Sequence, residues 1–134
     1  MRRLLAAALA AASLASCSRM TGDFRLSGSV SLSPRLRDRA PGIGAMLFIV
    51  AENPGGVPVA VKRIVNPAFP ARYQMRPEDL IVPELPNREP LKVHAELNTH
   101  GAVGRPRPGD LWGDAPAVVR PGAGGVDIVL DRVR

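Results

Sequence analysis

The chain has 134 residues, including 14 Pro and 13 Gly, and a formal net charge of +6 at pH 7. That length fits one ordinary domain and is too short for two. The positive charge is mild, and neither a basic stripe nor a set of aromatic platforms accompanies it, so we expect no nucleic-acid partner.

Residues 1–16 have the three-part layout of a secretory signal peptide: a positive start, an apolar stretch and small residues. The apolar stretch is well below the roughly 20 residues that a membrane-spanning helix needs. Leu14-Ala15-Ser16-Cys17 fits the bacterial lipobox, in which the signal is cut immediately before a cysteine that receives a diacylglycerol. We therefore expect cleavage after residue 16 and lipidation of Cys17. The alternative is cleavage at a nearby A-x-A-like site, with Cys17 unmodified.

Lipidation of Cys17 predicts a protein anchored to a membrane of the bacterial cell envelope through its N-terminal lipid and facing the periplasm. Ser18, and not Asp, follows the cysteine. This favours the outer membrane slightly over the inner membrane. Residues 17–22 would form the lipidated tether, and residues 23–134 the folded domain.

Cys17 is the single cysteine of the chain. Its lipidation would leave the folded part without a thiol, which excludes a disulfide, a C-x-x-C redox pair and a C-x-x-C-H haem attachment site. A blue-copper centre is excluded as well, because it needs a cysteine thiolate. We expect no cofactor.

The first half of the domain has the pattern of four strands. Residues 24–32 alternate apolar and polar side chains, which marks a strand with one buried and one wet face. After a short turn or single helical turn at 35–42, the continuous apolar run 45–51 predicts a central strand covered on both faces. A turn joins it to a strand over 57–65, and a further strand is expected over 69–75.

The second half is richer in turns. Residues 76–90 are irregular because prolines break them. A second alternating strand with a wet face spans 91–98, and 101–116 has the composition of a long loop. Two closing strands are expected over 117–119 and 126–133. About seven short strands without a helical period predict an all-β fold, a two-layer antiparallel β-sandwich.

Several short segments in this order also occur in a known family. They are Gly28-Ser29-Val30-Ser31-Leu32-Ser33-Pro34, Leu47-Phe48-Ile49, Pro58-Val59-Ala60-Val61-Lys62-Arg63, Pro108-Gly109-Asp110-Leu111 and Val126-Asp127-Ile128-Val129-Leu130-Asp131. From about Leu26 onward, the chain resembles the C-terminal immunoglobulin-like domain of CycH-type cytochrome c biogenesis proteins. The resemblance implies an immunoglobulin-like sandwich with a non-catalytic periplasmic role. That role is to help hold apocytochrome during haem attachment, with apocytochrome c or haem-lyase components as protein partners.

Five basic residues are candidates for contact with a partner. Arg35, Arg37 and Arg39 offer cations to lipid phosphates or to an acidic partner, and the alternative is a solvated turn. Lys62 and Arg63 lie in the segment most similar to the family, although outer strand faces often carry such residues for solubility.

Trp112, the single tryptophan, lies in the predicted 101–116 loop. It would either anchor a partner, as tryptophans often do in interfaces, or fold back as an apolar lid over an open end of the sandwich. Of these two interpretations we favour the lid.

His94 and His100 lie an even number of residues apart, so both would face the wet side of a straight strand. A metal site there needs at least one more ligand, and Glu96 is the nearest candidate. A turn at 99–101 would break the alignment, so we expect two solvated imidazoles and no metal.

The sequence offers no catalytic constellation. Ser27, Ser29 and Ser31 lack a G-x-S-x-G context, and the neighbours Glu78 and Asp79 point to opposite sides of an extended chain. We therefore expect a non-enzymatic, membrane-anchored periplasmic binding or assembly accessory, linked to cytochrome c maturation by the resemblance. Two alternatives stay open: a periplasmic metal-handling lipoprotein that uses the two histidines and a methionine, and a structural envelope lipoprotein.

Overall fold

The computed structural model describes residues 24–82 and 89–134, so the predicted signal peptide (1–16) and lipidated tether (17–22) lie outside it. The described residues form eight strands and two short 3₁₀ helices. The strands are β1 (Leu26–Leu32), β2 (Met46–Glu52), β3 (Pro58–Val65), β4 (Ala71–Met75), β5 (Lys92–Asn98), β6 (Leu111–Asp114), β7 (Ile128–Leu130) and β8 (Arg132–Val133), and the helices are η2 (Pro34–Arg39) and η3 (Pro77–Asp79). No helix in these two ranges is long and apolar enough to cross a membrane.

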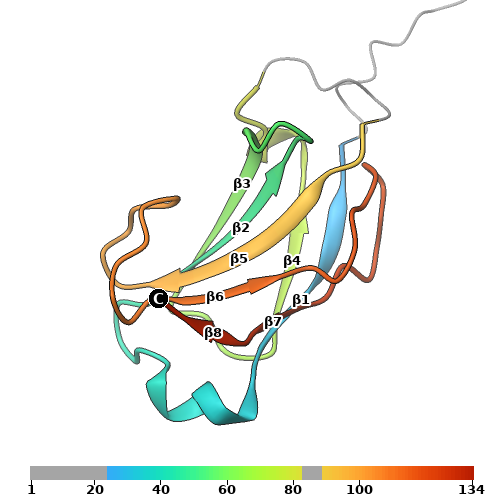
Figure 1. Ribbon diagram of the computed structural model, residues 1–134. Coiled ribbons are helices and arrows are strands. Elements are labelled where there is room, and N and C mark those ends of the chain that lie inside the picture. The colour runs from blue at the N-terminus through green and yellow to red at the C-terminus, as the bar shows by residue number, and fades with distance from the viewer. Residues whose placement is uncertain (1–23, 83–88) are drawn as a thin grey trace, which may run out of the picture.

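Two sheets pack face to face, as the alternating strands predicted (Figure 1). One has three strands in the order β4-β1-β7, and the other has five in the order β3-β2-β5-β6-β8. The two-layer, immunoglobulin-like β-sandwich is thereby confirmed. The expectation of purely antiparallel pairing is wrong at one place, because β7 lies parallel to β1, with Val30 opposite Ile128. The chain reaches β7 by crossing from the five-stranded sheet to the three-stranded one, and this crossover allows parallel pairing.

The core lies between the sheets and is built from alternate residues of the strands. Leu26 and Val30 of β1 face Leu47 and Ile49 of β2, which belong to the same buried cluster, and Leu97 of β5 joins them. Successive side chains of a strand point to opposite faces. The residues between these therefore lie on the outer surfaces of the sandwich, where the candidate site is found.

Two glycines permit the closest approaches between chain segments. A Cβ atom on Gly28 would lie 2.0 Å from the Val126 carbonyl oxygen, and one on Gly113 would lie 2.0 Å from the Val129 carbonyl oxygen. Any side chain at either position would push backbone away, so β6 can cross β7 closely only because residue 113 lacks a Cβ. The Tyr73 hydroxyl donates a hydrogen bond of 2.6 Å to the Val126 carbonyl oxygen, which fixes the same region.

The second half of the chain departs from the predicted elements. Strand β6 lies inside the stretch predicted as a loop, 101–116, and pairs with β5, placing Leu111 opposite Leu97. Its four residues include a glycine, so they carry no clear alternation. The predicted strand at 117–119 is reduced to one bridge, between Leu91 and Val119. The predicted strand at 126–133 is divided between β7 and β8, which belong to different sheets.

The start of β1 and helix η2 lie at opposite ends of the sandwich (Figure 1). The seven residues of β1 separate them, and at about 3.3 Å per residue they span about 20 Å. The predicted helical turn near 35–42 is confirmed by η2, which holds Arg35, Arg37 and Arg39.

Candidate functional site

The outer face of the five-stranded sheet carries the candidate site. Its strand register places Val61, Val50 and His94 side by side in one row. The neighbouring row contains Arg63, Phe48, Glu96 and Trp112. Paired residues of adjacent strands share a face, so side chains from four strands meet on this surface.

The supposedly wet side of β5 is buried, because the chain folds back over it after the strand ends. Gly101 N–H donates to Asn98 Oδ1 over 2.9 Å, and Asn98 Nδ2 donates to the Ala102 carbonyl over 3.1 Å. Gly104 N–H donates to Glu96 Oε2 over 3.0 Å. His94, Glu96 and Asn98 are therefore buried. The prediction of a wet face was wrong because the loop that follows β5 covers it, and the alternation within β5 gives no sign of that loop's position.

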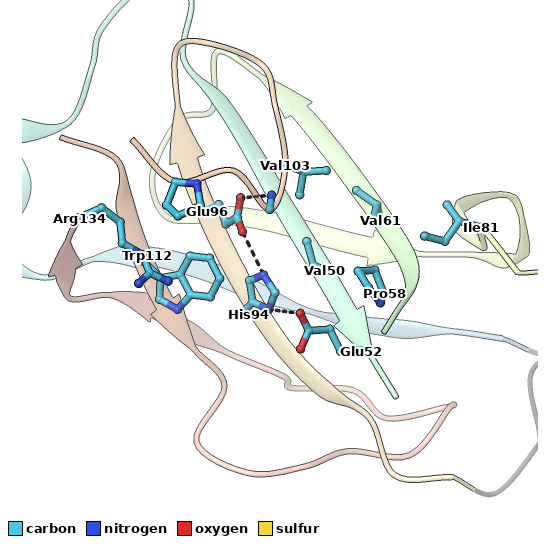
Figure 2. A pocket seen from close by; sticks show the side chains of 12 residues that line it. Val50, Glu52, Pro58, Val61, Ile81, His94, Glu96, Val103, Trp112 and Arg134 are labelled. Carbon is cyan, nitrogen blue, oxygen red and sulfur yellow. Dashed lines mark hydrogen bonds and ion pairs between the residues drawn. The ribbon is translucent and has the colours of Figure 1, made fainter. Parts of the chain in front are cut away.

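His94 lies between two carboxylates (Figure 2). Its Nε2 is 3.3 Å from Glu96 Oε1, and its Nδ1 is 3.6 Å from Glu52 Oε1. Only 7% of the His94 side chain and 6% of the Glu96 side chain are exposed, against 26% for Glu52. Both ring nitrogens thus face negative oxygens, and Glu52 is the carboxylate that solvent or a ligand can reach.

Trp112 forms one wall of the site. Its indole stacks on the His94 imidazole, with ring centroids 4.2 Å apart and 15° between the planes. The Arg134 guanidinium carbon lies 4.4 Å from a Trp112 ring centroid, an arrangement typical of a cation–π contact. Trp112 Nε1–H donates to Asp114 Oδ1 over 3.3 Å. Both predicted placements of Trp112, in a loop and over an open end of the sandwich, are wrong, because it belongs to β6 and faces outward from the sheet.

These residues border a pocket of about 350 Å³. Most of its wall is apolar, and the polar groups lie together at the His94 side (Figure 2). The lining residues are Val50, Glu52, Pro58, Val61, Ile81, His94, Glu96, Val103, Gly104, Pro106, Trp112 and Arg134. Ile81 and Val103 at its rim are 59% and 38% exposed. An apolar concavity with a few converging polar groups is suited to binding a ligand or a side chain.

Lys62 and Arg63 do not form one surface. Lys62 shares a face with Ile49, toward the other sheet, and its Nζ lies 3.4 Å from Asp79 Oδ2. Arg63 is exposed and lies on the pocket face beside Phe48. Neighbouring residues of a strand point to opposite sides, so only Arg63 is placed near the candidate site.

Arg35, Arg37 and Arg39 are exposed on η2, away from the pocket. Arg35 Nη2 donates to the Asp131 carbonyl over 2.5 Å. Arg35 and Arg39 also line a shallow groove with Arg132, whose guanidinium pairs with Asp114 and Asp131.

The two histidines have separate partners. The His100 Nδ1 accepts a hydrogen bond from Ala102 N–H over 3.2 Å, so its Nε2 carries the proton and donates to Asp110 Oδ2 over 2.8 Å. His94 is bound in the pocket, and neither ring is freely solvated, contrary to expectation. Within residues 24–82 and 89–134, no group of three or more His, Cys, Asp or Glu side chains is arranged to hold a metal ion.

Sequence reasoning missed Glu52, Arg134 and the apolar rim. Glu52 follows the apolar run that became β2, and Arg134 lies next to β8. Their approach to His94 and Trp112 depends on the pairing of strands distant in sequence. The alternation of β5 had placed Glu96 on the same side as His94, and this was the one usable signal.

Comparisons with known proteins agree with this architecture. The family model described as the cytochrome c-type biogenesis protein H Ig-like domain matches residues 26–131. An uncharacterized protein of Aquifex aeolicus (strain VF5) is 33% identical over 107 residues, which cover 79% of this chain and 69% of that protein. No solved structure matches. The family match spans every strand from β1 to β7 and all pocket residues except Arg134.

Proposed function

The chain belongs to the family of the cytochrome c-type biogenesis protein H Ig-like domain, which links it to cytochrome c biogenesis. From this premise we propose that it is a non-enzymatic accessory that binds a polypeptide partner. The proposed partner is apocytochrome c or a component of the haem lyase. The proposed contact surface is the outer face of the five-stranded sheet around the pocket.

The pocket beside Trp112 is the observation that supports this proposal best. Tryptophan and arginine are enriched among residues that dominate binding energy at interfaces, and Trp112 and Arg134 are stacked at its wall. Ile81 and Val103 expose apolar surface at its rim. Removal of that surface from water would contribute about 25 cal/mol for each Å² buried.

The proposed cellular position follows from Cys17. We propose that its lipid holds the domain on the periplasmic side of an envelope membrane, with the outer membrane slightly favoured over the inner. A tether to the membrane would raise the effective concentration of the domain near membrane-bound partners.

Under this proposal the arginines of η2 serve a partner or solvent in preference to lipid phosphates. They lie at the end of the sandwich opposite the start of β1, from which the tether would lead. About 20 Å separates the start of β1 from η2, and this exceeds the electrostatic screening length of about 8 Å at physiological salt.

Co-purification from the native host tests the proposal. The tagged full chain would be isolated in detergent, and apocytochrome c and haem-lyase components would be quantified in the eluate. Ile81→Lys places a positive charge on the pocket rim, whereas Ile43→Lys is a matched control at an exposed position outside the pocket. These isoleucines are 59% and 98% exposed, so both variants should fold.

We expect Ile81→Lys to lose the partner and Ile43→Lys to retain it. Deletion of the gene should also reduce the amount of mature c-type cytochrome. Normal cytochrome levels after deletion, together with no enrichment of either partner class by the unaltered chain, would remove the proposal.

A further inference from the structure

One polar group of the pocket has hydrogen-bonding capacity that its neighbours leave unused. Both oxygens of Glu96 are engaged, one by His94 and one by Gly104 N–H. The Trp112 N–H is directed to Asp114. Among the hydrogen bonds and ion pairs of the described residues, the Glu52 side chain has one partner, His94, which lies 3.6 Å from Oε1. That distance is too long for a hydrogen bond, so the Glu52 carboxylate can still accept several.

Carboxylate oxygens are the charged acceptors that the pocket offers. Two carboxylates, Glu52 and Glu96, flank a single imidazole, and the Arg134 cation lies on an exposed residue against the indole. The Glu52 side chain is three-quarters buried, with 26% of its surface exposed. Partial burial lowers the local dielectric constant and strengthens the attraction of this carboxylate for a cation.

The apolar wall suits the methylene stem of a basic residue. Val50 is buried at the floor, and Val61, Pro58 and Ile81 extend the apolar lining toward the rim. Lysine and arginine side chains commonly lay their stems along apolar surface and place the charged head at a polar end. In Figure 2, Glu52 lies beside His94 and comes from the same strand as Val50 of this apolar wall.

We propose that the pocket receives a lysine or arginine side chain from an extended segment of the partner polypeptide, with its stem against Val50 and Val61 and its cation at Glu52. This rests on the proposed function and specifies the chemistry that the site selects. Pro58 and Val61 of the lining belong to β3, an edge strand of its sheet, and Ile81 lies outside that edge, where its N–H donates to the Val59 carbonyl. A partner segment can approach there without displacing an inner strand.

Lys92 is the nearest internal competitor for Glu52. The two residues are opposite each other in the β2–β5 pairing, but no ion pair joins them among the described residues, and Lys92 is exposed. Lys92→Gln should therefore leave binding of a cationic side chain intact or strengthen it modestly.

Short peptides can test this selectivity on the full chain in detergent micelles. The probes would be acetyl-Ala-Val-X-Val-Ala-amide with X as lysine, arginine, norleucine or glutamate. Fluorescence of Trp112 reports on binding directly, because it is the single tryptophan and forms a pocket wall. Norleucine provides an uncharged side chain of similar length, so it separates the contribution of the cation from that of the stem.

We expect the lysine and arginine peptides to bind at least about tenfold more tightly than the norleucine peptide, since a hydrogen bond to a charged group contributes that much. The glutamate peptide should bind most weakly. Glu52→Gln should abolish the preference for the cation while leaving the norleucine affinity within about twofold. Glu52→Lys should prevent binding of the cationic peptides.

Equal binding of the lysine and norleucine peptides, a preference for glutamate, no saturable change with any peptide, or an unchanged preference in Glu52→Gln would each overturn the inference. Circular dichroism of each variant would verify folding. If Glu52→Gln still captures apocytochrome c or haem-lyase components normally, the proposed function stands and this inference alone fails. Loss of capture by Ile81→Lys, together with the lysine and arginine preference of the unaltered chain, would support both the proposed function and this inference.

Discussion

Replacement of Glu96 by alanine should destabilise the domain and release the loop that covers the pocket. The Glu96 side chain is 6% exposed. One of its oxygens lies 3.3 Å from His94 Nε2, and the other accepts the Gly104 N–H. The substitution would leave His94 with only Glu52, at 3.6 Å, and would leave the Gly104 amide without its acceptor.

A buried hydrogen-bonding group left without its partner costs about 1 to 3 kcal/mol, and the substitution leaves two such groups, on His94 and on Gly104. The pocket opens to solvent, so water can replace part of the lost interactions, and we expect a total loss of about 3 kcal/mol. For a domain of this size, that corresponds to a fall in melting temperature on the order of 10 °C. Glu96→Gln keeps an acceptor for Gly104 and should retain more than half of the lost stability.

Urea denaturation followed by circular dichroism gives the free energy of unfolding, and hydrogen exchange at the Gly104 amide tests the loop directly. Exchange at this amide should accelerate in Glu96→Ala before global unfolding. Glu78→Ala is a control at an exposed carboxylate and should change the free energy by less than about 0.5 kcal/mol. A loss below about 1 kcal/mol in Glu96→Ala, with unchanged exchange at Gly104, would refute the reasoning.

Three further outcomes are expected. Gly113→Ala should lower the free energy of unfolding by about 3 kcal/mol in a urea titration, because its Cβ would meet the Val129 carbonyl at 2.0 Å. Gly42→Ala, with open space around it, should be nearly neutral. Similar values for the two variants would contradict the close packing of β6 on β7. Burial, with a smaller contribution from Asp127, raises the pKa of Tyr73. The tyrosine therefore ionises first in the unfolded chain, and stability declines as the pH rises above about 10. Absorbance at 295 nm should show tyrosinate only beyond that pH. Tyrosinate that forms at the ordinary pKa in folded protein would be inconsistent with this burial. Mass spectrometry of protein extracted from cells should find diacylglycerol on Cys17, and an unmodified thiol there would rule out the proposed anchor.

The fold was largely predictable because alternation of apolar and polar residues depends on local sequence. The alternating residues of β1 and the continuous apolar run of β2 became buried strands as expected. Strand β6 was missed because Gly113, which permits contact with β7, interrupts any apolar pattern. The parallel pairing of β1 with β7 was missed because strand orientation depends on how the connection crosses between sheets.

The site was less predictable than the fold. Alternation placed His94 and Glu96 on one face of β5, but it gave no sign that the loop through Gly104 would bury them. Trp112 was a candidate because tryptophan is common in interfaces. Its stacking on His94 could not be predicted, because it depends on the register of β5 with β6. Glu52 comes from another strand, and its role depends on what the other pocket groups already bind.

Site-specific photo-crosslinking in living cells tests the central claim most directly. A photoreactive amino acid would replace Ile81 at the pocket rim, or Ile43 as a control, in the full-length chain. We predict that illumination links the Ile81 position to apocytochrome c or a haem-lyase component, with little product at position 43. Equal products at both positions, or adducts at position 81 that contain no protein of cytochrome c maturation, would contradict the account.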